Sequence, residues 1–170
     1  DARAWRYEMD AMRRAGIHIV IIQWLRMNDS RYIPSDPGAV DPTRIILEYA
    51  DRHGMRVFIG LAHADLWWKR LRDQRYLDLA AATSIHVANE VWARYGGHRS
   101  FAGWYLPQEL RDASYPPQQI DALRTFLKGL GDHWDVELGG SARQLLPGED
   151  TSDFNRDTRR VYVTPTMTDI

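Results

Sequence analysis

Apolar runs alternate with amphipathic stretches along this chain, and the alternation predicts an α/β fold. The runs Ile17–Trp24, Met55–Leu61 and Phe101–Leu106 are rich in β-branched or aromatic residues and almost unbroken, as strands buried on both faces of a sheet are. The segments beside these runs have hydrophobic residues at helical spacing. This spacing predicts helices over Ala4–Ala15, from Asp41-Pro42 to Gly54, and over Tyr76–Tyr95.

Two segments of the chain match position by position. Arg14–Ile21 and Arg52–Ile59 each contain a helix end, a glycine, an apolar residue, a basic residue and then a strand. The distance from Gly16 to Gly54 is that of one strand–helix unit, which favours parallel pairing of the two strands. A further strand is predicted near residues 161–165, and it ends at a proline as the run before Pro107 does.

This pattern is typical of a (β/α)8 barrel, but a full barrel takes roughly 250 residues. The chain has 170 residues, with predicted parallel strands near 17–24, 56–61, 101–106 and 161–165. We therefore expect residues 1–170 to form one incomplete barrel domain. A smaller doubly wound sheet is the alternative.

Composition narrows the classes of partner. A net charge of -1 gives no reason to expect nucleic acid or an anionic membrane surface. No apolar stretch approaches the roughly 20 residues of a membrane span, so we expect no membrane insertion. The chain has no cysteine, which excludes disulfides and thiolate metal sites. If a signal peptide has been removed, secretion or a periplasmic location is favoured over the cytoplasm.

The carboxyl ends of the strands are where active sites form in either architecture. Glu109 follows the third strand and Pro107, so we expect it at the mouth of the barrel. An acid in an apolar, aromatic-lined mouth has its pKa raised by desolvation, which suits it to protonate a glycosidic oxygen. The alternative is that Glu109 begins a turn or pairs with Arg111.

Amide, aromatic and imidazole side chains follow the same strands. The predicted substrate-binding residues are Gln108, Trp24, Gln23, His63, Trp67 and Tyr105. This set suits a neutral, hydroxyl-rich ligand, because the chain has no glycine-rich phosphate loop, and we expect no cofactor. For Trp24 and Trp67, packing in the core or over the barrel end is an equal alternative to stacking on a sugar. His63 and Asp65 could bind a metal, but two residues do not make a site, and none is predicted.

Several of these stretches together resemble the bacterial domain-of-unknown-function 4434 family. The resemblance rests on Trp5–Gly16, Ile17–Trp24, Tyr32–Ser35, Ala50–Met55, Val57–Leu61 and Phe101–Glu109. Members of that family are regarded as glycoside-hydrolase-like barrels. The resemblance implies that Phe101–Leu106 is the fourth barrel strand, Glu109 the acid/base and Gln108 the preceding amide.

The same resemblance implies that the first barrel strand would precede Asp1 and that the second carboxylate would follow Ile170. The sequence therefore predicts a glycoside hydrolase-like protein that cleaves an oligo- or polysaccharide. One alternative is a carbohydrate-binding barrel without catalysis. The other is a metal-dependent sugar isomerase or epimerase that uses His63 and Asp65.

Overall fold

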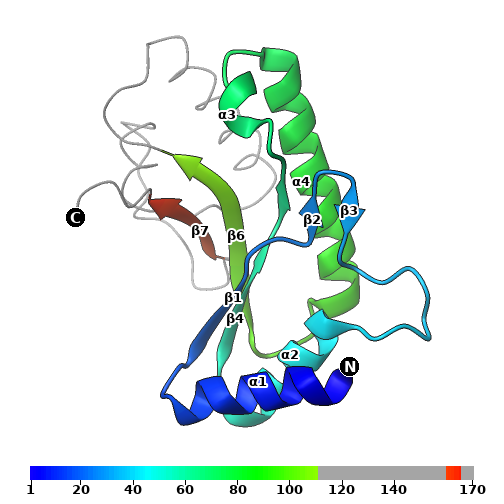
Figure 1. The fold of residues 1–170 in the computed structure, drawn as a ribbon, viewed down its shortest axis with the longest axis vertical. Coiled ribbons are helices and arrows are strands. Elements are labelled where there is room, and N and C mark those ends of the chain that lie inside the picture. The colour runs from blue at the N-terminus through cyan, green and yellow to red at the C-terminus, as the bar shows by residue number, and fades with distance from the viewer. Residues whose placement is uncertain (111–159, 166–170) are drawn as a thin grey trace.

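A computed structural model gives the fold of residues 1–110 and 160–165, with side chains described for residues 1–108 (Figure 1). The helices are α1 (Ala2–Arg14), α2 (Pro42–His53), α3 (Trp67–Arg70) and α4 (Gln74–Tyr95). The main strands are β1 (Ile19–Ile22), β4 (Arg56–Gly60), β6 (Phe101–Leu110) and β7 (Arg160–Pro165). Within these ranges no helix has both the length and the apolar character needed to cross a membrane.

The main strands form one four-stranded sheet in the order β1-β4-β6-β7, and all neighbours in it are parallel. Ile19 of β1 lies opposite Arg56 of β4, which confirms the parallel pairing predicted from the repeated segments. The predicted mixed α/β fold with a parallel sheet is therefore confirmed. The described strands form an open row, so closure into a barrel remains a prediction.

A small second sheet continues the chain beyond the carboxyl ends of β1 and β4. Its strands are β3 (Ser30–Arg31), β2 (Arg26–Met27) and β5 (Ala62–His63). β2 pairs with β3 as an antiparallel hairpin and with β5 in parallel. The stretch between β1 and α2 therefore contributes two short strands at this end of the molecule.

Local sequence sets the helix ends as predicted. Asp41 caps α2 by accepting a hydrogen bond from the backbone N–H of Arg44 at 3.0 Å, and Pro42 occupies the first turn. Gly54 ends α2 at a φ of 66°, and Gly16 follows α1 at a φ of 82°. Both values lie in the left-handed region that glycine adopts without a steric penalty.

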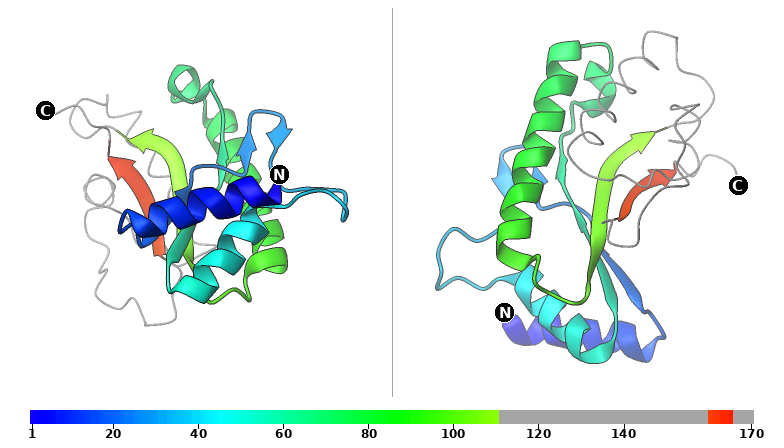
Figure 2. Two further views of the ribbon diagram at one scale, coloured as in Figure 1. Left: turned by 60° about the horizontal axis from the view of Figure 1, so that its bottom comes forward. Right: turned by 180° about the vertical axis from the view of Figure 1, so that it is seen from behind.

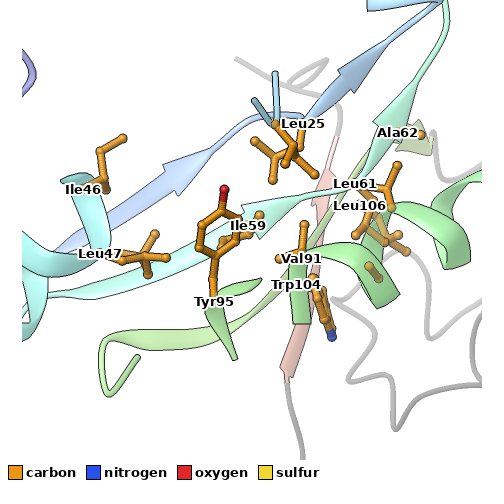
Figure 3. Packing of buried hydrophobic residues seen from close by; sticks show 14 of the residues in the cluster. Leu25, Ile46, Leu47, Ile59, Leu61, Ala62, Val91, Tyr95, Trp104 and Leu106 are labelled. Carbon is orange, nitrogen blue, oxygen red and sulfur yellow. The ribbon is translucent and has the colours of Figure 1, made fainter. Parts of the chain in front are cut away.

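Helix α4 runs alongside the sheet and starts at the end where the strands finish, beside α3 (Figures 1 and 2). Its buried face includes Val91 and Tyr95, which pack with Ile59 of β4 and Trp104 of β6 (Figure 3). The Tyr95 hydroxyl donates to the Asp41 carboxylate at 2.9 Å, tying the end of α4 to the start of α2. These contacts hold the end of α4, and the buried Leu77 and Ala81 hold its first half against the core.

Strand β1 differs from the sequence prediction. We expected burial on both faces, but Ile19 is 44% and Ile21 49% exposed. Val20 and Ile22 do pack against the core. Ile19 and Ile21 alternate with these two residues, so they lie on the opposite face of the sheet, which the described part of the chain leaves uncovered at β1.

Strand β6 also differs from the prediction, because it continues through Pro107 to Leu110 instead of ending at Leu106. A proline has no N–H to give to a sheet. The register between β6 and β7 shifts between Leu106 and Leu110, so the ladder does not need that missing donor. Glu109 therefore belongs to the last residues of the strand and does not follow it.

Candidate functional site

A pocket of about 270 Å³ lies between the carboxyl ends of the strands and the first half of α4. Its walls come from β2, β5, α3, α4 and the end of β6. The lining residues that carry the argument are Arg26, Asn28, His63, Trp67, Tyr76 and Gln108. This volume lies just below the range of ordinary ligand pockets, which begins at about 300 Å³. The pocket thus brings together the predicted residues Gln108, His63 and Trp67.

Gln108 is the buried polar residue of this pocket, with 3% of its surface exposed. Its Nε2 donates a hydrogen bond to the backbone carbonyl of Ala62 at 2.7 Å. Only the NH₂ end of an amide can face a carbonyl oxygen, so this bond fixes which way the side chain points. Its Oε1 is buried and has no hydrogen-bond partner within the described residues. A buried acceptor in that state calls for a donor.

His63 of β5 lies beside Gln108 on the pocket wall. Trp24 stacks on the His63 ring, with ring centroids 5.9 Å apart and planes inclined by 18°. Trp24 itself does not line the pocket. It therefore packs against the imidazole without forming part of the pocket wall itself.

A pair of reciprocal hydrogen bonds holds the pocket rim. The Asn28 Nδ2 donates to the Asp65 carboxylate at 2.9 Å, and the Asp65 backbone N–H donates to Asn28 Oδ1 at 3.0 Å. Asn28 has a φ of 52°, a left-handed conformation that asparagine tolerates better than most residues. Its N–H also donates to the His63 carbonyl at 2.9 Å. The Asp65 carboxylate, which the isomerase or epimerase alternative would use as a metal ligand, is thus engaged by Asn28.

Gly60 sets the path by which the chain leaves β1. A Cβ placed on Gly60 would lie 1.9 Å from the Gln23 carbonyl oxygen. The Leu25 N–H donates to the carbonyls of Gly60 and Leu61, both at 3.1 Å. Any larger residue at position 60 would push the segment around Gln23 away from β4. Glycine therefore allows the close crossing that carries Trp24 to the His63 ring and Arg26 to the pocket.

Helix α4 supplies pocket residues that the sequence analysis did not identify. They are Tyr76, Leu79, Ala80 and Thr83. Their spacing places them on one face of the helix, which is a pattern that could have revealed them. Burial raises the pKa of Tyr76, although the nearby Arg70 charge opposes this, so its hydroxyl stays a protonated donor at neutral pH.

The other predicted site residues lie outside the pocket or on its wall. Trp67 lines the wall but is 1% exposed, so it offers no open face for stacking. Tyr105 is buried in β6 and Gln23 is exposed at the end of β1, and neither lines the pocket. Glu109 directly follows Gln108 in β6, so their Cα atoms are about 3.8 Å apart, but its side chain lies outside the described set, as does Arg111.

A larger cavity, of about 610 Å³, lies elsewhere, against the start of α2 and the end of α4. Its lining residues include Asp41, Arg44 and Arg94. Asp41 accepts from the Arg44 N–H at the start of α2, and the Arg94 guanidinium donates to the Pro34 carbonyl in the loop before α2. None of the predicted site residues reaches it. We place the candidate site in the smaller pocket because it alone, of the two, meets the carboxyl ends of the strands.

Within the described residues, no group of three or more His, Asp or Glu side chains is arranged to hold a metal ion.

Residues 1–137 match the model of the family described as Domain of unknown function (DUF4434). No functionally curated protein shows significant sequence similarity to the chain.

Among solved structures, the chain is similar to that of a putative alpha-L-fucosidase from Bacteroides thetaiotaomicron, with 21% identity and a TM-score of 0.63. The match covers 97% of this chain and 45% of that one, so the chain spans less than half the length of that structure. At this identity the likeness shows a shared fold.

Proposed function

The chain belongs to the domain-of-unknown-function 4434 family, and from that premise we propose that the protein is a glycoside hydrolase acting on an oligo- or polysaccharide. Glu109 would be the general acid that protonates the leaving oxygen. A sugar ring would bind in the pocket formed by the carboxyl ends of β5 and β6 and the first half of α4. Gln108 and His63 would orient it.

The observation that carries this proposal is the buried Oε1 of Gln108. An unmet acceptor in a buried site costs about 1–3 kcal/mol, and a hydroxyl donor removes that cost. A sugar presents several hydroxyl groups and can supply such a donor. Because Gln108 and Glu109 are consecutive, a sugar held by the amide is also within a few Å of the backbone that carries the acid.

Two further observations support a carbohydrate ligand. The pocket combines apolar wall residues, such as Trp67 and Leu79, with hydrogen-bonding groups of His63, Tyr76 and Gln108, a mixture suited to the faces and edges of a sugar. The shared fold with a structure described as a fucosidase agrees with the same class of ligand, and α-L-fucosides are therefore among the first substrates to test.

The direct test compares two kinds of leaving group in the full-length protein. Glu109→Gln should lower hydrolysis of an alkyl glycoside or oligosaccharide about 10²- to 10⁴-fold, because the leaving oxygen then departs without a proton. A nitrophenyl glycoside should lose much less, since nitrophenolate departs as a stable anion. The exposed Glu8 of α1 provides the control, Glu8→Gln, which should leave both rates unchanged.

Equal, small effects of Glu109→Gln on both substrates would contradict its role as the acid. The second candidate function is a carbohydrate-binding protein without catalysis, which the Gln108 acceptor favours independently of Glu109. It predicts that the wild-type protein binds the sugar and that no substrate is cleaved at any pH. Hydrolysis lost in Glu109→Gln with binding retained supports the hydrolase.

A further inference from the structure

Arg26 is a charged residue of the pocket to which neither the sequence analysis nor the proposed function assigns a role. It lies in β2, is half-buried and lines the same pocket as Gln108. Its Nε donates to the Asn28 backbone carbonyl at 3.0 Å. Asn28 is itself held by hydrogen bonds to Asp65 and to the His63 carbonyl. The carbonyl that accepts from Arg26 Nε therefore has a fixed position, which restricts where the guanidinium can lie.

Among the described residues, the remaining donors of Arg26 have no partner. Within the described residues the side chain forms no ion pair and no hydrogen bond apart from the one to Asn28. By contrast Arg31, on the same hairpin, and Arg94 both pair with Glu90. Since Nε is occupied, the edge formed by the two Nη atoms is the part left for a ligand. That edge matches the two oxygens of a carboxylate.

The charge balance of the pocket also favours an anion. Asp29 is the carboxylate that lines the pocket with Arg26, and its residue is exposed. An exposed charge is screened by water and salt, whereas a half-buried one acts more strongly on its surroundings. Of these two charges among the described lining residues, that of Arg26 therefore acts more strongly on a ligand inside the pocket.

We propose that this pocket selects a sugar that carries an anionic oxygen group, with Arg26 binding that group and Gln108 Oε1 accepting from a hydroxyl of the same ring. The proposal rests on the proposed carbohydrate function and narrows its substrate to acidic saccharides, such as those containing uronic acids. It revises the expectation of a neutral ligand. A sulfate ester offers the same charge, but its oxygens are not coplanar as those of a carboxylate are.

Binding to the full-length protein tests this without any need for turnover. Calorimetric titrations with glucuronate and galacturonate are compared with glucose, galactose and glucose 6-sulfate. Uronates should bind on the order of tenfold or more tightly than the neutral sugars, because hydrogen bonds to a charged group are the stronger kind. Their affinity should fall as salt is raised. Glucose 6-sulfate binding more tightly than the uronates would assign the pocket to sulfated sugars instead and overturn the carboxylate choice.

Variants of Arg26 separate the effect of its positive charge from the effect of its two paired Nη donors. Arg26→Gln should remove the preference for uronates, and Arg26→Lys should restore only part of it. Asp29→Asn should strengthen uronate binding. Arg31 lies outside the pocket, so Arg31→Gln should leave uronate binding unchanged. Unfolding curves of each variant establish that it is folded.

The outcomes distinguish this inference from the proposed function. Neutral sugars bound as tightly as uronates, or an unchanged preference in folded Arg26→Gln, would overturn the inference and leave the hydrolase proposal intact. Uronate binding that depends on Arg26, in a protein that cleaves no glycoside, would support the inference and contradict the hydrolase.

Discussion

Gln108 Nε2 donates a hydrogen bond of 2.7 Å to the carbonyl oxygen of Ala62, 46 residues earlier in the chain. The bond joins the end of β6 to β5 and lies in the buried wall of the pocket. Both the stability of this end of the sheet and the orientation of the amide depend on it.

Removing this amide should destabilise the protein. We expect Gln108→Ala to lower the free energy of unfolding by about 1–3 kcal/mol, because the Ala62 carbonyl is left buried without its donor and the shorter side chain leaves a cavity, which together outweigh the removal of the unpaired Oε1. Urea unfolding followed by circular dichroism measures this. The control is Gln74→Ala, which removes an exposed amide bonded to Asp78 and should change stability by about 0.5 kcal/mol or less. Equal losses in both variants would contradict the importance of the buried bond.

Gly60 should tolerate no side chain. A Cβ at this position lies 1.9 Å from the Gln23 carbonyl oxygen, which is backbone and cannot rotate away. We expect Gly60→Ala to cost about 3 kcal/mol or more and to displace the chain that leads to Arg26. Thermal unfolding compares it with Gly97→Ala, where an added Cβ meets nothing within 4 Å. A Gly60→Ala protein as stable as Gly97→Ala would refute the close crossing.

Two substitutions of Asn28 separate its side-chain bonds from its backbone conformation. Asn28→Ala and Asn28→Gly both lose the two hydrogen bonds to Asp65. Only alanine also carries the penalty of a positive φ, about 1–2 kcal/mol. Chemical denaturation should therefore rank wild type above Asn28→Gly and Asn28→Gly above Asn28→Ala. The reverse order of the two variants would contradict the left-handed assignment.

Asp51 should make stability depend on acid pH. Burial by itself raises the Asp51 pKa, but hydrogen bonds from His98 and Ser100 outweigh it, and the pKa lies below its ordinary value. The His98 ring nitrogen and the Ser100 N–H lie 2.8 and 2.7 Å from the carboxylate. A group whose pKa is lowered by folding stabilises the protein above the unfolded pKa of about 3.9, and this contribution is lost as pH falls through the folded value.

We expect Asp51→Asn to be less stable than wild type at pH 7 by about 1–2 kcal/mol and to lose less stability on acidification below about pH 4. Unfolding free energies from pH 2 to 7 measure the difference. Glu48→Gln serves as the control, since the Glu48 pair with Arg52 is exposed and should contribute little. Parallel pH profiles for wild type and Asp51→Asn would show that this contact does not stabilise the fold.

Features set by neighbouring residues were predictable from the sequence. The caps at Asp41 and Gly54 and the strand–helix alternation depend on local geometry, and the structure confirms them. The end of β6 was wrongly predicted, because the effect of Pro107 depends on the register with β7, which no local pattern records. Helical spacing places Tyr76, Leu79, Ala80 and Thr83 on one face of α4, but that this face and Arg26 line one pocket depends on contacts between distant segments.

The most direct test of the central claim is a crystal structure of full-length Glu109→Gln with an oligosaccharide bound. We expect a sugar ring in the pocket between β5, β6 and α4, with a hydroxyl within hydrogen-bond distance of Gln108 Oε1 and the scissile oxygen facing residue 109. A sugar bound away from this pocket, with Gln108 Oε1 facing a protein donor, would contradict the claim.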